Sequence, residues 1–533
     1  MISLFVFAAA VTTGIEPWAL DRLDLDLHLT LDPPALTMTG KAKVRALADS
    51  DGPAFGLNDD DARVMTMQSL RAGGVEAVIA PFAEGSSIEV ARLQLPEPVK
   101  AGATLEVEFT ATSRDRSSQF IIGKAAAYGS WVESWYPRPA IAEKALASPA
   151  APGTTTLRMP RGWRSVAPGV LVSRSEAGDE VVEVWETTRP AARSFAAAPF
   201  VVHDTIEAEG HEIGVFLLKE RPAVRAQAVA LAKSVAAMER HFGPFPYPSF
   251  HIVELPEALP FAAASEQGFI VVRASLLDAE AGNLPLFAHE AAHAWWGNLV
   301  RTDGPGGKML SEAAAQYGAV ISIEAVEGEA AARRFLRYSR EGYSPTQSAL
   351  GYFYIWRQGG DKPLSQLESD RWDHNLADAK GHWFYRMVRN RIGDEAFFTA
   401  LRSILRDFAG ERATVADLRR AFLNVSDDPA LPQFLEQWLD RTGAPVLNVD
   451  WWSADRGRAA EIHIEQLQSG EPYQLPLELA IDLDDGEVLL TTVQLCERKQ
   501  RFFIATPVRP VGVRLDPQDK VLLWRPEYGS RPE

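Results

Sequence analysis

The sequence has little of what would cross-link it or carry it through a membrane. Its 533 residues include one cysteine, Cys496, which excludes an intramolecular disulfide and any zinc cluster built from cysteines. Cys496 ends an apolar–polar alternation typical of a strand, so we expect a buried or half-buried thiol. No run of 18 or more apolar residues is present, so hydropathy predicts no integral membrane span.

Positive charge is also in deficit. Lys and Arg number 54 against 71 Asp and Glu, which gives a net charge of −17. The average field of such a chain repels phosphate, which argues against nucleic acid or an anionic membrane surface as the main partner. The hydrophobic content of 46% and charged content of 23% are those of a globular protein, and the length predicts three to four domains.

The N-terminus contains a short apolar stretch, Ile2 to Val11, that ends in small residues. This pattern is typical of the hydrophobic core and cleavage zone of a secretory signal, although no Lys or Arg precedes it. We therefore expect residues 1–14 to be a signal segment and the protein to be periplasmic or secreted. The alternative is a short N-terminal strand in a cytoplasmic protein.

The remaining chain predicts a multidomain α+β protein. Residues 15–204 alternate with period two, as in Leu23 to Leu29, and turn residues interrupt them at short intervals, which predicts a β-domain. Residues 205–444 are mainly helical in pattern, with expected helices at 223–242, 284–300, 309–327 and 378–392 and an irregular stretch at 344–370. Residues 445–533 alternate again and predict a C-terminal β-sandwich.

The pattern His289-Glu290-Ala291-Ala292-His293 carries the chemistry. Histidines four residues apart on a helix project from one face, and neutral imidazole is a good zinc ligand. Glu290, on a neighbouring face, can reach a water beside the metal and serve as general base. The competing interpretation is that both histidines are ordinary core or surface residues.

A catalytic zinc site needs a third protein ligand, and Glu312 is placed to provide it. It follows His293 by 19 residues, across a Gly/Pro-rich loop that allows the next helix to return antiparallel. Two histidines and one glutamate form a known catalytic zinc set, so we expect one Zn²⁺ per chain. The other histidines, His374 among them, have no spacing that indicates a ligand.

Several further segments resemble the zinc aminopeptidase family of aminopeptidase N. The zinc signature of that family, His-Glu-x-x-His followed after eighteen residues by Glu, has the spacing found here. The resemblance extends over nearly the whole chain, through Trp135-Tyr136-Pro137, Phe242 to Pro248, Trp295 to Asn298, Met309 to Glu312, Gln437-Trp438-Leu439 and Gly443-Ala444-Pro445. It implies a thermolysin-like catalytic domain in a short, three-domain form without the family's large C-terminal helical domain.

The resemblance also implies roles for individual residues. His289, His293 and Glu312 would bind zinc, and Glu290 would act as general base. Glu266 lies in Ala263 to Gln267, which stands where the family has Gly-Ala-Met-Glu-Asn, and would bind the free α-amine of a peptide substrate.

The sequence departs from the family at the expected oxyanion donor. The family has a Tyr two residues before a Lys-Gly pair, whereas Asp378 precedes Lys380-Gly381 here. An ionised Asp cannot donate a hydrogen bond, so full activity would require a substitute for the tyrosine. We predict His382, one helical turn after Asp378, as this catalytic donor. The alternatives are Tyr343, Tyr352, Tyr354 and Tyr385.

The sequence therefore predicts a zinc aminopeptidase that acts on peptides with a free amino terminus. Two alternatives remain. A catalytically weakened homologue could bind zinc and act as a scaffold or binding protein, as Asp378 would allow. A zinc hydrolase or endopeptidase with another class of substrate would also fit the metal motif.

Overall fold

The computed structural model describes residues 18–58, 63–82, 86–114, 116–142, 145–146, 150–256, 261–339 and 346–532. The predicted signal segment and Tyr343 lie outside these residues. The chain divides into two compact units, one made of Met1–Ala232 and Pro246–Asn283, the other of Lys233–Phe245 and Leu284–Glu533. No helix in the described part of the chain is long and apolar enough to cross a membrane.

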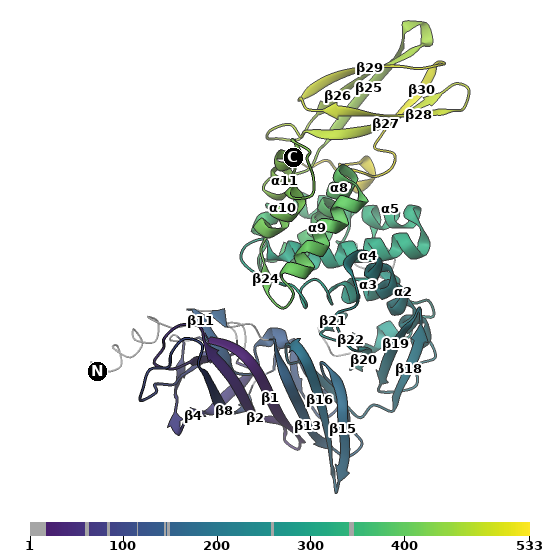
Figure 1. Cartoon of the computed structure of the whole chain (residues 1–533). Helices are drawn as coiled ribbons and strands as arrows, with labels where there is room; N and C mark the ends of the chain where they lie inside the picture. Colours follow the sequence, from purple (N-terminus) through teal and green to yellow (C-terminus); the bar gives the residue numbers. More distant parts are fainter. Residues whose placement is uncertain are drawn as a thin grey trace. The chain divides into compact units, whose positions relative to one another are not determined.

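The first unit is built on a broad, mostly antiparallel sheet (Figure 1). Its order is β15-β16-β13-β1-β2-β8-β4-β5, in which only β1 and β13 pair in parallel. The strands are β1 (Trp18–Leu31), β2 (Pro34–Ala46), β4 (Met65–Ala72), β5 (Val75–Glu76), β8 (Thr104–Ser113), β13 (Ala151–Pro160), β15 (Val170–Ala177) and β16 (Glu180–Ala191). Leu23, Leu25, Leu27 and Leu29 of β1 are all buried, which confirms the strand predicted from their alternation.

Two smaller sheets complete the N-terminal sheet-rich region. One, in the order β14-β17-β10-β9, contains β9 (Phe120–Ile122), β10 (Ala127–Gly129), β14 (Arg164–Val166) and β17 (Phe195–Ala198). The other, in the order β12-β11-β3-β7-β6, contains β3 (Ala54–Leu57), β6 (Val78–Pro81), β7 (Glu89–Arg92), β11 (Arg138–Ala142) and β12 (Ala145–Leu146).

A further five-stranded sheet of this unit contains the segment predicted to bind the substrate amine. Its order is β18-β19-β20-β22-β21, with bounds β18 (Val202–Ala208), β19 (His211–Leu217), β20 (Phe250–Leu255), β21 (Ala263–Glu266) and β22 (Phe269–Arg273). The central strands β19, β20 and β22 run parallel, whereas β21 is antiparallel at the edge. Glu266 is thus the last residue of an edge strand.

The second unit contains the helical region. Its helices are the end of α2 (Val224–Phe242), then α3 (Leu284–Ala292), α4 (Glu312–Glu327), α5 (Glu329–Tyr338), α6 (Ala349–Arg357), α7 (Asp373–Leu376), a π-helical turn η5 (Ala377–Gly381), α8 (His382–Ile392), α9 (Asp394–Asp407), α10 (Val415–Leu423) and α11 (Leu431–Leu439). The short strands β23 (Arg301–Thr302) and β24 (Arg412–Ala413) pair in parallel. Helix α6 occupies part of the stretch expected to be irregular, so that prediction was wrong there.

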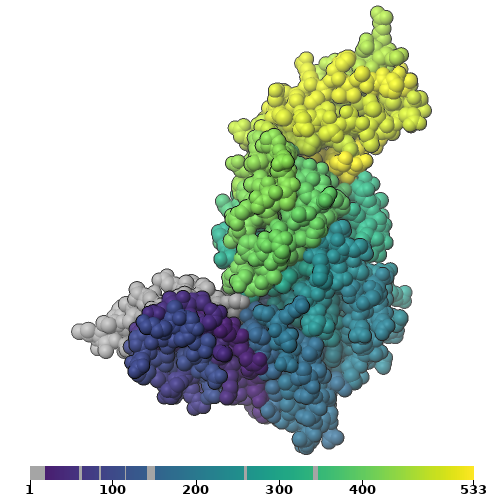
Figure 2. Space-filling view, viewed as in Figure 1, coloured from purple at the N-terminus to yellow at the C-terminus, as the bar shows by residue number. Residues whose placement is uncertain are grey.

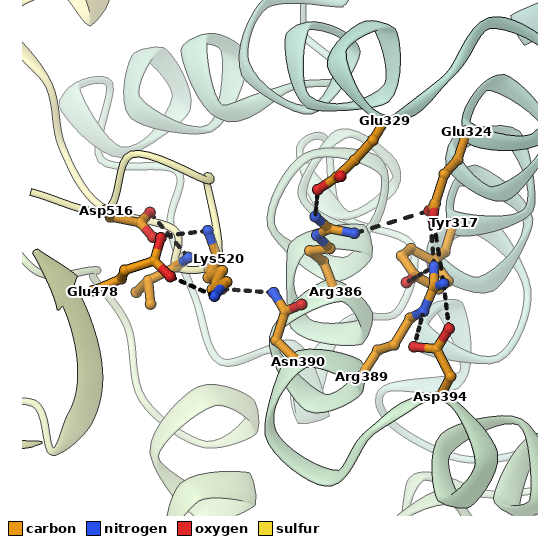
Figure 3. Close-up of polar contacts among 11 residues, drawn as sticks. Tyr317, Glu324, Glu329, Arg386, Arg389, Asn390, Asp394, Glu478, Asp516 and Lys520 are labelled. Carbon is orange, nitrogen blue, oxygen red and sulfur yellow. Dashed lines mark hydrogen bonds and ion pairs between the residues drawn. The ribbon is translucent and has the colours of Figure 1, made fainter. Parts of the chain in front are cut away.

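Ion pairs fasten α4, α5, α8 and α9 to one another (Figure 3). Arg389 on α8 bonds Glu324 on α4 at 2.8 Å and Asp394 on α9 at 2.8 Å. Arg386, one turn earlier on α8, reaches Glu329 at 3.4 Å. These pairs tie α8, and the turn that precedes it, to the helix that begins with Glu312.

The C-terminal strands form two three-stranded sheets in the same unit. The orders are β25-β26-β29 and β28-β27-β30, with bounds β25 (Leu447–Ala454), β26 (Ala459–Gln466), β27 (Leu475–Leu483), β28 (Val488–Leu495), β29 (Lys499–Ala505) and β30 (Pro510–Leu515). Figure 2 shows these residues in yellow, continuous with the green helices. The Asn390 side chain on α8 donates to the Lys520 carbonyl at 3.3 Å, and Lys520 Nζ bonds Glu478 of β27 at 2.6 Å (Figure 3).

Cys496 lies directly after β28, where the alternation has ended, and it is exposed. The expectation of a buried or half-buried thiol was therefore wrong. The strand pattern ends one residue earlier than assumed, and the cysteine falls in the turn between β28 and β29.

Candidate metal centre

His289 and His293 stand at the end of α3, a helix whose nine residues are all buried. The helix ends at Ala292, so the expected helix to Val300 is shorter than predicted. The Asn298 and Leu299 amides bond back to the carbonyls of His293 and Ala294 in the tight turn that follows. His293 N–H still bonds the His289 carbonyl at 3.4 Å, so the two imidazoles remain one turn apart on one side of the chain.

Close packing between small residues brings α3 and α4 together. A Cβ built on Gly318 of α4 would lie 2.5 Å from Ala292 Cβ, so no larger side chain fits without movement. This close contact aligns the start of α4 with the end of α3. As a result Glu312, the first residue of α4, lies beside both histidines.

The three side chains converge on one point. His289 Nε2 and His293 Nε2 lie 3.2 Å apart, and Glu312 Oε2 lies 3.7 Å from each of them. Two nitrogens bound to one tetrahedral zinc at the usual bond length would be separated by ~3.3 Å. The donor atoms therefore fit a single tetrahedral zinc ion with one further position open.

The outer ring nitrogens explain why the inner ones face each other. His289 Nδ1 bonds Gln316 Oε1 at 2.9 Å, and His293 Nδ1 bonds the Trp296 carbonyl at 2.9 Å. Both partners are acceptors, which places a proton on each Nδ1 and leaves each Nε2 facing the centre, where it can bind a metal once it is unprotonated. Burial lowers the pKa of His289, but the hydrogen bond to Glu312 and the nearby carboxylates outweigh burial and raise this pKa to about 10, so a bound metal would displace a proton from the site.

We predict that Gln316→Leu lowers zinc affinity by about 10- to 100-fold, because outer-sphere partners hold a metal-binding imidazole in its tautomer and orientation. Competition with a chromogenic chelator measures the affinity. Ser322→Ala, at another buried polar position on α4, is the matched control and should leave zinc affinity unchanged. Equal zinc affinity in Gln316→Leu and wild type would remove the proposed role of Gln316.

Glu290 is buried among these groups, at 7% exposure. Burial raises the pKa of its carboxyl, and the nearby His289 and His293 oppose that shift. A carboxylate with a raised pKa is a better proton acceptor than an exposed one. The environment of Glu290 therefore suits a general base.

Glu266 is in the first unit and is also buried, at 1% exposure. Its Oε1 accepts a 2.6 Å hydrogen bond from the Tyr128 hydroxyl on β10. Its Oε2 is buried and makes no hydrogen bond of standard geometry in the described residues, although Ser130, Ser194 and the Trp131 amide lie near the carboxylate. Burial raises the pKa of Glu266 to about 7, against the opposing effect of the Tyr128 and Ser130 hydroxyls.

The surroundings of Asp378 differ from what the sequence suggested. His382 is fully buried, and its Nδ1 bonds the Asp378 carbonyl within the same helical turn. The side chain facing Glu312 is instead that of His374 on α7, with Nδ1 3.4 Å from Glu312 Oε2. Its Nε2 lies 3.3 Å from Asp378 Oδ2. The assignment of the donor to His382 stays a prediction.

Two of the alternative tyrosines use their hydroxyl groups elsewhere. Tyr385 donates to the Met309 carbonyl at 2.6 Å, and Tyr352 donates to Asp361 at 2.9 Å. Lys380 is buried with Asp361 and the Arg441 carbonyl. His374 has no spacing to the zinc motif that indicates a ligand, but its i,i+4 spacing to Asp378 could have indicated the pair.

Known proteins resemble this chain in the same region. The model of the peptidase family M1 domain matches residues 228–438. "Probable aminopeptidase 1" of Sulfurisphaera tokodaii is 23% identical over 318 residues, which are 55% of this chain and 38% of that protein. Human "Aminopeptidase RNPEPL1" is 24% identical over 241 residues, 42% of this chain and 32% of that protein.

A third relative, "Tricorn protease-interacting factor F2" of Thermoplasma volcanium, is 26% identical over 235 residues, 41% of this chain and 28% of that protein. The matches thus cover roughly a third of each of these relatives. Residues 228–438 match the peptidase family M1 domain, and the predicted resemblance to the aminopeptidase N family is confirmed.

Proposed function

We propose that this protein is a zinc-dependent aminopeptidase that removes residues from the amino terminus of peptides. The observation that carries the proposal is the convergence of two Nε2 atoms, 3.2 Å apart, on the Glu312 carboxylate. Each imidazole is held in the required tautomer from outside. The M1 domain and the names of the relatives support peptide hydrolysis as the reaction.

His289, His293 and Glu312 would hold one zinc ion. When bound, zinc lowers the pKa of a coordinated water towards 7 and polarises the peptide carbonyl. Glu290 takes the proton that the attacking water loses and passes it to the departing amine. Its burial keeps bulk water from competing for that proton.

Glu266 would bind the free α-amine of the substrate. This buried carboxylate has hydroxyl neighbours but no cationic partner in the described residues, and a substrate ammonium would supply one. A charge-assisted bond at a fixed carboxylate favours peptides with a free terminus over blocked or internal ones.

The domain boundaries and the type of each domain are also part of this proposal. We infer a thermolysin-like catalytic domain over residues 205–444, after an N-terminal β-domain at 15–204. The two C-terminal sheets support a β-sandwich at 445–533. The periplasmic or secreted location rests on residues 1–14 alone and stays a prediction.

Replacing Glu266 with Ala tests the amine site. We expect kcat/KM for free-amine aminoacyl substrates to fall by about 10- to 100-fold, the usual effect of a lost charge-assisted hydrogen bond. Glu212→Gln, at an exposed position on β19 of the same sheet, should behave as wild type. If N-acetylated substrates were cleaved as fast as free ones by wild type, the endopeptidase alternative would replace this assignment.

The same carboxyl predicts a pH dependence. Its pKa of about 7 lies above the ordinary value, so the group is protonated and neutral below that pH and cannot pair with an ammonium. The α-amine of a peptide loses its proton at about 8. The kcat/KM of wild type should therefore fall on the acid side of about pH 7, and Glu266→Ala should lose that limb.

A further inference from the structure

The segment that precedes α8 places an unassigned histidine beside the candidate metal centre. His374 lies on α7 with a side chain that is 53% exposed, whereas Asp378, one turn later in η5, is fully buried. His374 Nδ1 lies 3.4 Å from Glu312 Oε2, and Nε2 lies 3.3 Å from Asp378 Oδ2. One ring edge therefore faces a proposed zinc ligand and the other a buried carboxylate.

Asp378 is held rigidly in this position. Gln347 Nε2 donates to its Oδ2 at 2.6 Å. A Cβ built on Gly381 would lie 2.5 Å from Ala313 Cβ, so η5 packs directly against the first turn of α4. The π-helical geometry of η5 is a local departure from α-helix of a kind often found at functional sites. The carboxylate is thus a fixed acceptor that orients the His374 ring.

The position of His374 suits a donor to the reacting carbonyl. Both ring nitrogens of His374 lie beside a carboxylate oxygen, which favours an N–H on each: Nε2–H is directed at Asp378, and Nδ1–H is the donor that remains for a substrate carbonyl. Because Nδ1 lies 3.4 Å from Glu312 Oε2, a substrate carbonyl held beside that oxygen would be within reach of the Nδ1–H. His382 differs, because it is fully buried and its Nδ1 is used by the Asp378 carbonyl.

We propose that His374 is a catalytic residue that donates a hydrogen bond to the carbonyl oxygen of the scissile peptide bond as negative charge develops there. Asp378 is a positioning residue that fixes the imidazole from behind. Together the two residues would supply the hydrogen bond to the developing oxyanion that an ionised aspartate at position 378 cannot donate. This inference rests on the proposed peptidase function and deepens it.

The test compares His374→Ala with wild type, both as the full-length zinc-loaded protein. Loss of one oxyanion donor lowers kcat by about 100- to 1,000-fold, and we expect KM to stay within threefold. Zinc content should remain one per chain. Because the side chain is exposed, added imidazole should restore part of the lost rate in the variant and none in wild type.

A second readout does not depend on turnover. A phosphinic pseudodipeptide with a free amine presents a tetrahedral anion, and its inhibition or binding constant should weaken in His374→Ala by about the factor lost in kcat/KM. Asp378→Asn should lower kcat by about tenfold, and added imidazole should not rescue it. In the double variant with His374→Ala, the Asp378 change should add almost nothing.

His463→Ala is the matched control, because His463 on β26 also pairs with a carboxylate, Glu461, at 2.8 Å. His382→Gln tests the competing donor. The proposal is overturned if His374→Ala keeps kcat within threefold of wild type. It is also overturned if His382→Gln alone shows the loss in kcat and in phosphinate affinity.

The zinc content of wild type and of His374→Ala distinguishes one more outcome. Glu312, His374 and Asp378 also offer three ligand atoms that lie within 4.8 Å of one another. Two zinc ions in wild type and one in His374→Ala would make His374 a metal ligand and contradict the donor role. If wild type binds zinc but cleaves no peptide, the proposed function fails, while the phosphinate affinities still decide the role of His374.

Discussion

Glu290→Gln is expected to lower kcat by about 1,000-fold while zinc stays bound at one per chain. Glutamine keeps the shape of the side chain but cannot accept and hold a proton, and general-base catalysis contributes roughly 100- to 10,000-fold to enzymatic rates. None of the three proposed ligands is touched, so metal content should not change. The measurement is kcat on an aminoacyl chromogenic substrate together with zinc content by elemental analysis.

The melting temperature of Glu290→Gln distinguishes a loss of general-base catalysis from a loss of folding. Burial raises the pKa of Glu290, so ionising it costs free energy in the folded state, and an uncharged glutamine should fold at least as well. The melting temperature of Glu290→Gln should therefore equal or exceed that of wild type at pH 7. Glu395→Gln, at an exposed position on α9, is the control with unchanged rate. More than a tenth of wild-type activity in Glu290→Gln would mean that Glu290 is not the base.

Glu312→Ala should have the second largest effect, because it removes a proposed zinc ligand. Removing one of three protein ligands should lower zinc affinity by more than the about 10- to 100-fold expected for Gln316→Leu, because an inner-sphere bond is lost and not only an orienting one. The dialysed variant should contain little zinc and show no measurable hydrolysis. Competition with a chelator compares the two variants directly.

The effect of zinc on folding stability gives an independent check on Glu312→Ala. A ligand that binds only the folded state stabilises it by about 4 kcal/mol at a thousand times its dissociation constant. Adding zinc to metal-free wild type should therefore raise its melting temperature, and the same addition should shift Glu312→Ala far less. A zinc affinity equal to that of wild type in Glu312→Ala would contradict the ligand assignment.

The features of the fold that follow from the periodicity of neighbouring residues could be predicted from the sequence. The alternation of Leu23 to Leu29 predicted a strand, and β1 contains it. The four-residue spacing of His289 and His293 predicted two imidazoles on one side of the chain, and their Nε2 atoms lie 3.2 Å apart. These features depend on helix and strand periodicity, which neighbouring residues determine.

Features set by tertiary packing could not be predicted in this way. Helix α3 ends at Ala292 because the chain turns back after it, although the apolar pattern continues to Val300. The position of His374 depends on η5 packing against α4 through Gly381, a contact between segments about 70 residues apart. Gln316, which holds His289, showed no spacing to the zinc motif beyond its place on the helix of Glu312.

Part of the chain's excess of acidic residues is concentrated at this site. Glu290, Glu312 and Asp378 lie close together with His289 and His374. Such a cluster costs free energy unless cations neutralise it, and a zinc ion meets that requirement. The overall charge of −17 alone could not have indicated where this happens.

The most direct test of the account measures zinc content and hydrolysis in one preparation of wild type and Glu290→Gln. The substrates are aminoacyl compounds with a free amine and their N-acetylated counterparts. The account predicts one zinc per chain in both proteins, with hydrolysis only in wild type and only of free-amine substrates. One zinc per chain in wild type with no turnover of any peptide would contradict it.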